Sequence, residues 1–101
     1  MYKINYCEQA YNDIEQIIYY ISHKLNNPTA SRKIKTKIIN SEKIISLFPH
    51  IGNDITNQKG KNYYNYRVNN YYIIYYVDEV NKIINIVRVL YRKKNYESIL
   101  K

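Results

Sequence analysis

The side chains best suited to chemistry in this chain are arginines and tyrosines that lie on predicted strands or directly after them. Arg67 falls in the middle of one predicted strand, while Arg92 follows the last strand and Tyr96 lies shortly beyond. Guanidinium groups can hold phosphates and stabilise a pentacovalent phosphate, and a tyrosine can stack on a base. Cleavage of RNA by its own 2′-hydroxyl needs no metal. Arg67 and Arg92 are therefore candidate catalytic residues, and Tyr96 is a candidate for stacking on a base.

Further cations and one tyrosine surround this set and are candidates for RNA binding. They lie in the loop before the strands, within the last strand and in the basic stretch after it. These residues are Lys61, Arg88, Tyr91, Lys93 and Lys94.

Arg88 has a structural alternative to a role in RNA binding. It lies inside an apolar strand, between two valines. A cation in such surroundings needs a partner, and a carboxylate such as Asp13 or Glu42 can supply one. The sequence leaves both roles open.

Signatures of metal sites and of activated nucleophiles are missing from the sequence. Cys7 is the single cysteine, and His23 and His50 are the two histidines, so no ligand cluster has the spacing of a metal site. With only Gly52 and Gly60, the chain has no glycine-rich phosphate loop. We expect no metal site and no cofactor.

Length and composition restrict the class of protein. A chain of 101 residues fits one domain, residues 1–101. Its net charge of +8 favours a polyanionic partner, or an acidic protein that covers the same surface; solubility alone is the alternative. A single cysteine favours a reduced, cytoplasmic setting. The N-terminus resembles a strand rather than a signal peptide, and no apolar run approaches the ~20 residues of a membrane helix.

Hydrophobic periodicity predicts one strand and two helices in the first half of the chain. Residues 2–6 alternate as in a strand. Residues 8–25 and residues 28–48 carry apolar side chains at steps of three and four, which is typical of amphipathic helices. Asn27 can cap the second helix, with Pro28 at its first position. Two helices joined by so short a break should form an antiparallel pair.

The second half is predicted to form a loop followed by three strands. Residues 49–62 contain glycine, asparagine and proline and are expected to form a loop. Strands are expected at residues 63–69, 71–77 and 83–91, which are rich in aromatic and β-branched residues. The order β-α-α-β-β-β predicts an α+β fold, in which a helical hairpin packs on a small, twisted, mostly antiparallel sheet.

The strand at residues 63–69 is expected to expose one of its faces. Tyr63, Asn65, Arg67 and Asn69 share that face, which is too polar for a core and should meet solvent or a ligand. Asn69 and Asn70 suit a tight hairpin turn, because asparagine tolerates positive φ.

Taken in order, these segments resemble the RelE/ParE superfamily of toxins from type II toxin–antitoxin modules, from Tyr2 to about Leu100. In the first half the resemblance rests on Tyr2-Lys-Ile-Asn-Tyr6, Ala10-Tyr-Asn-Asp-Ile14, Leu25-Asn-Asn-Pro28 and Leu47-Phe48-Pro49. In the second half it rests on Tyr66-Arg67-Val68, the run from Asn70 to Glu79 and the run from Ile86 to Arg92. The fold of that family has the element order predicted above.

The resemblance implies a growth-inhibiting toxin that a cognate antitoxin protein holds inactive. RelE-like members cleave mRNA in the ribosomal A site without a metal, whereas ParE-like members inhibit DNA gyrase. Arg92 and Tyr96 match the arginine and tyrosine after the last strand of the RelE-like branch, but an arginine of the preceding strand falls at Tyr72 here. The run from Arg88 to Arg92 also resembles the ParE-like pattern. The expected function is ribosome-dependent mRNA cleavage, with ribosome and mRNA as partners; gyrase inhibition without catalysis is the alternative.

Overall fold

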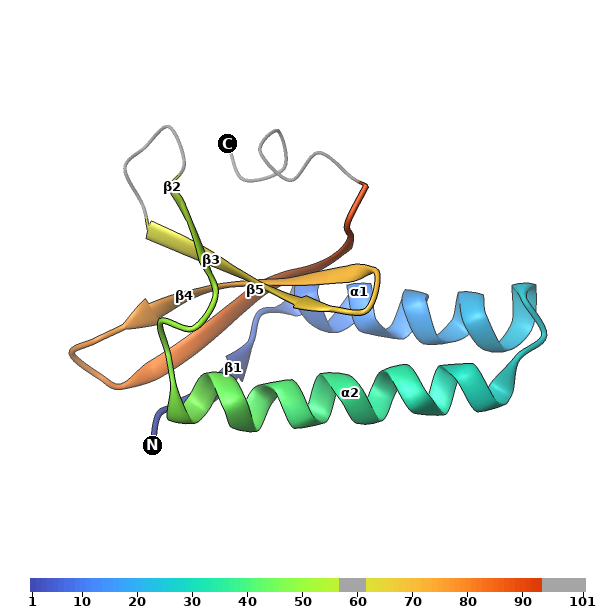
Figure 1. Cartoon of the computed structure of the whole chain (residues 1–101), viewed down its shortest axis with the longest axis horizontal. Helices are drawn as coiled ribbons and strands as arrows, with labels where there is room; N and C mark the ends of the chain where they lie inside the picture. The colour runs from blue at the N-terminus through green and yellow to red at the C-terminus, as the bar shows by residue number, and fades with distance from the viewer. Residues whose placement is uncertain (57–61, 94–101) are drawn as a thin grey trace.

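The computed structural model describes residues 1–56 and 62–93, and its elements follow the predicted order with one additional strand (Figure 1). The helical part comprises α1 (Glu8–Tyr19), the π-helical turn η1 (Tyr20–Lys24) and α2 (Pro28–Leu47). The strands are β1 (Lys3–Tyr6), β2 (Asn53–Thr56), β3 (Asn62–Val68), β4 (Tyr71–Asp78) and β5 (Ile83–Tyr91).

The five strands form one sheet in the order β1-β5-β4-β3-β2. β1 runs parallel to β5, and the other neighbouring strands are antiparallel. Both helices lie on one side of the sheet as an antiparallel pair (Figure 1). The predicted α+β architecture, with a helical hairpin on a mostly antiparallel sheet, is therefore confirmed.

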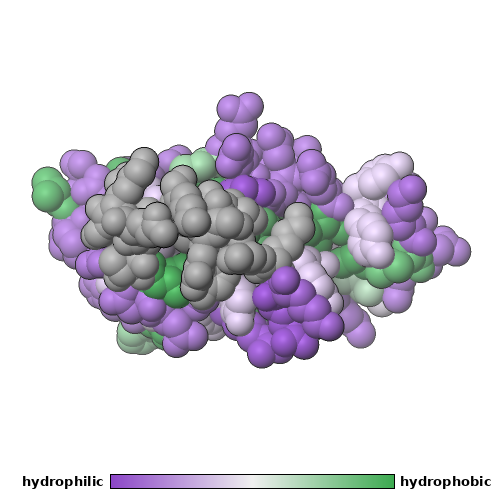
Figure 2. Space-filling view, turned by 90° about the horizontal axis from the view of Figure 1, so that it is seen from above, coloured by the Kyte–Doolittle hydropathy of each residue, from purple (hydrophilic) through white to green (hydrophobic). Residues whose placement is uncertain are grey.

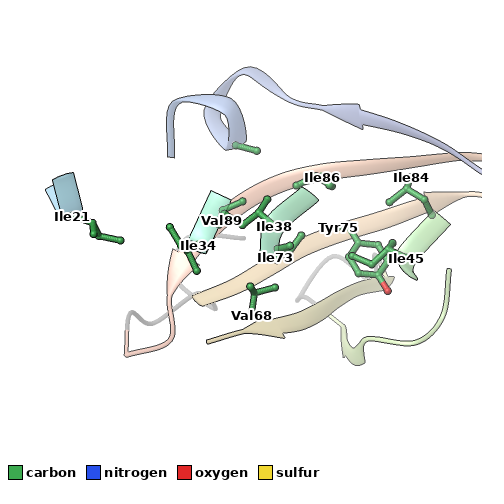
Figure 3. Close-up of a cluster of buried hydrophobic side chains, with 11 residues drawn as sticks. Ile21, Ile34, Ile38, Ile45, Val68, Ile73, Tyr75, Ile84, Ile86 and Val89 are labelled. Atoms are coloured by element: carbon green, nitrogen blue, oxygen red, sulfur yellow. The ribbon is translucent and has the colours of Figure 1, made fainter. Parts of the chain in front are cut away.

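The hydrophobic core fills the space between the helices and the sheet (Figure 3). Ile34, Ile38 and Ile45 recur at helical spacing along α2, and each is at most 3% exposed. They meet strand residues such as Ile73 and Ile86, which are fully buried. Burying one such side chain contributes about 1.5–3 kcal/mol, so this stripe fixes the helices against the sheet.

The start of α2 agrees with the prediction from the sequence, whereas the end of the first predicted helix does not. The Asn27 side chain accepts a hydrogen bond from the Ala30 N–H at 3.0 Å, so it caps α2 as predicted. The predicted helix over residues 8–25 instead changes at Tyr20 to a π-helical turn, in which the Leu25 N–H donates to the Tyr20 carbonyl. Apolar spacing alone does not distinguish such a turn from an α-helix.

The prediction of a loop over residues 49–62 is wrong for Asn53–Thr56, which form the edge strand β2. The Tyr75 hydroxyl positions the segment before it, donating to the Pro49 carbonyl at 2.8 Å and accepting from the Gly52 N–H at 3.1 Å. A Cβ at Gly52 would lie 2.8 Å from the Asn65 carbonyl oxygen. Periodicity misses this strand because it is short and mostly polar.

Asn65 is the second departure from the sequence-based expectation. It was expected to face solvent or a ligand, but it is only 6% exposed. Asn65 lies between Asn53 and Ile74 in the register of the sheet, and Ile74 is fully buried on the same face. Asn65 and Ile74 are thus buried on the face turned away from the helices, whereas Arg67, two residues further along, is exposed as expected.

Candidate functional site

The tight turn between β3 and β4 gathers cations from three parts of the chain. Asn69 adopts a φ of 54°, which asparagine tolerates, and its carbonyl accepts from Arg67 Nε at 2.8 Å. Its side-chain oxygen accepts from Lys37 Nζ on α2 at 3.0 Å. The Arg92 N–H donates to the Asn70 carbonyl at 2.7 Å. The turn thus holds α2, β3 and the end of β5 together.

We call the exposed cations of this region the cationic edge: Lys37, Arg67, Arg92 and Lys93. Within the described part of the chain, the side chains of Lys37 and Arg67 donate their hydrogen bonds to oxygens of Asn69 and not to carboxylates. A positive surface of this kind attracts phosphates or the carboxylates of an acidic protein segment. Of the predicted site residues, the structure therefore brings Arg67, Arg92 and Lys93 to one end of the sheet.

Arg88 points to a different partner. Its guanidinium contacts the Asp13 carboxylate through two hydrogen bonds, from Nε at 2.8 Å and from Nη2 at 3.0 Å. The same carboxylate accepts from the Val89 N–H at 3.0 Å. The hydrogen bonds to Asp13 raise the pKa of Arg88 above its usual value. The structural alternative, an ion pair with Asp13, is confirmed, and a role of Arg88 in RNA binding stays a prediction.

A mostly apolar groove of about 840 Å³ opens beside the cationic edge. Ile17, Tyr20 and Leu25 line it from the helical side, and Asn70 and Tyr91 line it from the sheet. The π-helical turn η1 contributes Tyr20 and Ile21 to the lining. The groove can therefore take apolar side chains of a partner while the edge meets its charges.

Comparison with known protein families shows the family to which the chain belongs. Residues 4–96 match the family model described as the ParE toxin of the type II toxin–antitoxin system parDE. The chain belongs to this toxin family. No curated protein sequence matches the chain significantly.

Three solved structures with the same fold come from toxin–antitoxin systems. The chain is similar to the chromosomal ParDE system of P. aeruginosa, with a TM-score of 0.68 and 16% identity, covering 90% of this chain and 96% of that one. It is also similar to the RelBE2 complex of Mycobacterium tuberculosis, with a TM-score of 0.61 and 15% identity, covering 90% of this chain and 98% of that one. The third structure is the RelE–RelB complex of Pyrococcus horikoshii OT3, with a TM-score of 0.64 and 18% identity, covering 93% of this chain and 98% of that one. At these identities the likeness concerns the fold.

The remaining predicted site residues of the toxin divide into two groups. Tyr91 is 40% exposed, contacts the Tyr71 ring edge-on at 5.9 Å and lines the groove. Lys61, Lys94 and Tyr96 lie outside the described residues. Tyr72 pairs in register with Arg67, so the position that carries arginine in the RelE-like branch lies beside the cationic edge.

Two features of the toxin escaped sequence reasoning. Lys37, on the exposed side of α2, joins the cationic edge through its hydrogen bond to Asn69. At the other end of the sheet, Glu79 accepts from the Tyr2 hydroxyl at 2.8 Å and contacts His50 Nε2 at 2.7 Å. These contacts lower the pKa of Glu79, and the hydrogen bond to Glu79 raises the pKa of Tyr2. No spacing in the sequence signals either contact.

Within residues 1–56 and 62–93, no three metal-ligating side chains come together, and no helix is long and apolar enough to cross a membrane.

Proposed function

We propose that this toxin inhibits growth by binding DNA gyrase, without catalytic chemistry of its own. The observation that carries the proposal is the composition of the cationic edge. Its described side-chain contacts are made to asparagines, and the nearby Asp13 carboxylate is already occupied by Arg88. RNA cleavage by general acid–base catalysis needs a proton acceptor and a proton donor beside the phosphate.

The two histidines do not fill that role among the described contacts. His23 stacks on Tyr19 at 4.3 Å in the helical hairpin, and His50 contacts Glu79 at the opposite end of the sheet. The family match to ParE toxins is in line with a binding toxin, because gyrase inhibition is the activity that the ParE-like branch implies. An exposed cationic edge beside an apolar groove suits a protein target.

Ribosome-dependent mRNA cleavage remains the second candidate, and one observation favours it. Arg67 and Arg92 both contact the Asn69–Asn70 turn, so two guanidinium-bearing residues lie at the same end of the sheet. In this proposal Arg67, Arg92 and Tyr96 are catalytic, and the cations and tyrosine predicted for RNA binding hold the message.

A paired assay separates the two functions. Purified toxin is added to a gyrase supercoiling reaction and, separately, to a cell-free translation reaction whose mRNA ends are mapped by primer extension. Gyrase binding predicts lost supercoiling and linear DNA after protein digestion, with intact mRNA. Normal supercoiling together with mRNA cut at ribosome-occupied codons would favour mRNA cleavage over gyrase binding. In that case, Arg92→Ala with Tyr96→Phe should abolish cleavage while the fold survives.

We also propose that a cognate antitoxin covers this end of the toxin. The neighbouring structures are complexes of toxins with antitoxins. An amphipathic, acidic antitoxin segment would place apolar side chains in the groove and carboxylates against Lys37, Arg67 and Arg92. Such a complex should weaken as ionic strength rises, because the charged contacts lie at an exposed rim. Titration calorimetry at low and high salt measures this, and a salt-independent affinity would contradict it.

A further inference from the structure

Asn69, in the tight turn between β3 and β4, is bonded to two cations of the cationic edge. Its backbone carbonyl accepts a hydrogen bond from Arg67 Nε at 2.8 Å. Its side-chain Oδ1 accepts another from Lys37 Nζ at 3.0 Å, across 32 residues of sequence. One residue therefore fixes a cation of the sheet and a cation of α2 relative to each other.

The turn restricts which residues suit position 69. Val68 pairs in register with Tyr71, so Asn69 and Asn70 alone connect β3 to β4. Asn69 has a φ of 54°, in the left-handed region that glycine, asparagine and aspartate tolerate. Glycine has no side chain that could accept a hydrogen bond from Lys37. Asparagine and aspartate meet both requirements, and they differ in charge.

The charge at position 69 decides whether the cations next to it keep their own charge for a partner. A carboxylate there would form an ion pair with Lys37 and cancel part of the positive charge of the edge. The amide oxygen of Asn69 restrains Lys37 without cancelling its charge. Arg88 shows the opposite arrangement, because the Asp13 carboxylate lies 2.8 Å from its Nε. The toxin thus holds a partly buried cation with a carboxylate and its surface cations with a neutral residue.

Most hydrogen-bond donors of Lys37 and Arg67 remain available to a partner. A lysine ammonium and an arginine guanidinium each carry several N–H donors. Within the described part of the chain, the hydrogen bonds of these two side chains are those to Asn69. Both residues are exposed, and the described surface seen from above is mostly hydrophilic (Figure 2). An anionic group of a partner can therefore form charge-assisted hydrogen bonds with both cations.

Restraint of these side chains in the free toxin favours affinity for such a partner. Lysine and arginine side chains lose rotamer freedom when a partner immobilises them. The hydrogen bonds to Asn69 remove part of this freedom beforehand, so less of it is lost on binding. Because Lys37 lies on α2 and Arg67 on β3, their relative position depends on the residue that contacts both.

We propose that Asn69 is the positioning residue of the cationic edge, and that it orders Lys37 and Arg67 for the carboxylates of an acidic protein segment. A neutral residue suits this role, because it orders the two cations and leaves the net charge of the edge unchanged. The inference rests on the proposed role of the edge as a protein-binding surface, but not on which protein is bound.

Fluorescence anisotropy with a labelled oligoglutamate peptide, at about 0.1 M salt, tests the proposal. Asn69→Asp keeps the acceptor for Lys37 and tolerates the same φ, but it adds a negative charge. It should therefore weaken binding about fivefold, with a thermal midpoint no lower than that of the wild type. Asn26→Asp is the matched control, since Asn26 is also exposed and has a φ of 49°. It precedes α2, whose first residue lies about 13 Å from Lys37 along the helix axis, so binding should hardly change.

A second variant separates positioning from a purely structural role. Asn69→Gly keeps the backbone carbonyl and the net charge but removes the acceptor for Lys37, so binding should weaken about threefold. In a Lys37→Met background the same substitution should cause no further loss, because the side chain that Asn69 positions is no longer charged. A purely structural role would instead give the same loss in both backgrounds.

Three results would overturn the proposal: no binding of the peptide by the wild type, equal binding by Asn69→Asp and Asn26→Asp, or equal losses from Asn69→Gly with and without Lys37. The gyrase supercoiling assay, run on the same variants, distinguishes this inference from the proposed function. If wild type and Asn69→Asp inhibit gyrase equally, the positioning role fails while gyrase inhibition stands. If the wild type leaves supercoiling intact and Asn69→Asp weakens peptide binding as expected, the positioning role stands while gyrase inhibition fails.

Discussion

The Arg88 guanidinium and the Asp13 carboxylate form a two-point ion pair that ties β5 to α1 across 75 residues of sequence. The side chains are 22% and 13% exposed, so the pair is largely shielded from water. Asp13 also accepts from the Val89 N–H, on the part of β5 that extends beyond its pairing with β1. The Asp13 carboxylate therefore accepts hydrogen bonds both from a backbone N–H of β5 and from the Arg88 guanidinium.

Replacing Asp13 by asparagine should destabilise the toxin by about 2 kcal/mol, because it leaves the partly buried Arg88 charge without its counter-ion. The free energy of unfolding in urea measures the effect. Glu15→Gln is the matched control, since Glu15 is an exposed carboxylate on the same helix. If both variants lose the same stability, the ion pair does not hold α1 to β5.

The hydroxyl of Tyr75 should hold the segment that leads into β2. Tyr75→Phe removes the partner of the Gly52 N–H and of the Pro49 carbonyl, and we expect a loss of about 1–2 kcal/mol. Amide hydrogen exchange at Gly52 should accelerate in the variant more than exchange in β4. Tyr11→Phe, which changes a tyrosine that is 57% exposed, should leave both measurements unchanged. Unaltered exchange at Gly52 in Tyr75→Phe would contradict this role.

Stability should fall at alkaline pH in part because of Tyr6. Burial, together with a hydrogen bond to Glu42 Oε1 at 2.5 Å, raises the pKa of Tyr6 far above its usual value of about 10. The folded state keeps this proton when the unfolded chain has lost it. The contribution to stability is therefore complete below about pH 10 and declines as the pH rises further.

The test compares the unfolding free energies of wild type and Tyr6→Phe between neutral pH and about pH 11. The variant should be less stable at neutral pH, because the bond to Glu42 is lost, and its decline above about pH 10 should be shallower. Tyr11→Phe serves again as the control and should follow the wild-type curve. Parallel curves for wild type and Tyr6→Phe would show that Tyr6 does not titrate differently on folding.

The cationic edge should be needed for toxicity but not for stability. Arg67→Ala with Arg92→Ala removes two exposed charges, so the thermal midpoint should change little while growth inhibition is lost. Lys35→Ala with Lys43→Ala removes the same charge from exposed positions of α2 and should remain toxic. Growth curves after induction without antitoxin provide the measurement. Full toxicity of the arginine double variant would exclude the edge as the target-binding surface.

Local chemistry explains why much of the fold was predictable. The isoleucines of α2 recur at helical spacing, Asn27 and Pro28 mark its start, and the aromatic and β-branched runs of β4 and β5 favour strands. The predicted ion pair of Arg88 followed from the cost of an unpaired charge in an apolar strand. By contrast, β2 and the burial of Asn65 depend on pairing with distant residues and leave no periodic signal.

The sequence by itself determined the helical hairpin, the long central strands and the basic character of the toxin, because these depend on side-chain type and near-neighbour spacing. The tertiary structure alone decided which cations act together. Lys37, Arg67 and Arg92 all contact the Asn69–Asn70 turn, so they lie close together in the fold. Arg88 instead forms an ion pair with Asp13. Strand register and helix docking set these distances, and both arise from contacts between residues far apart in the chain.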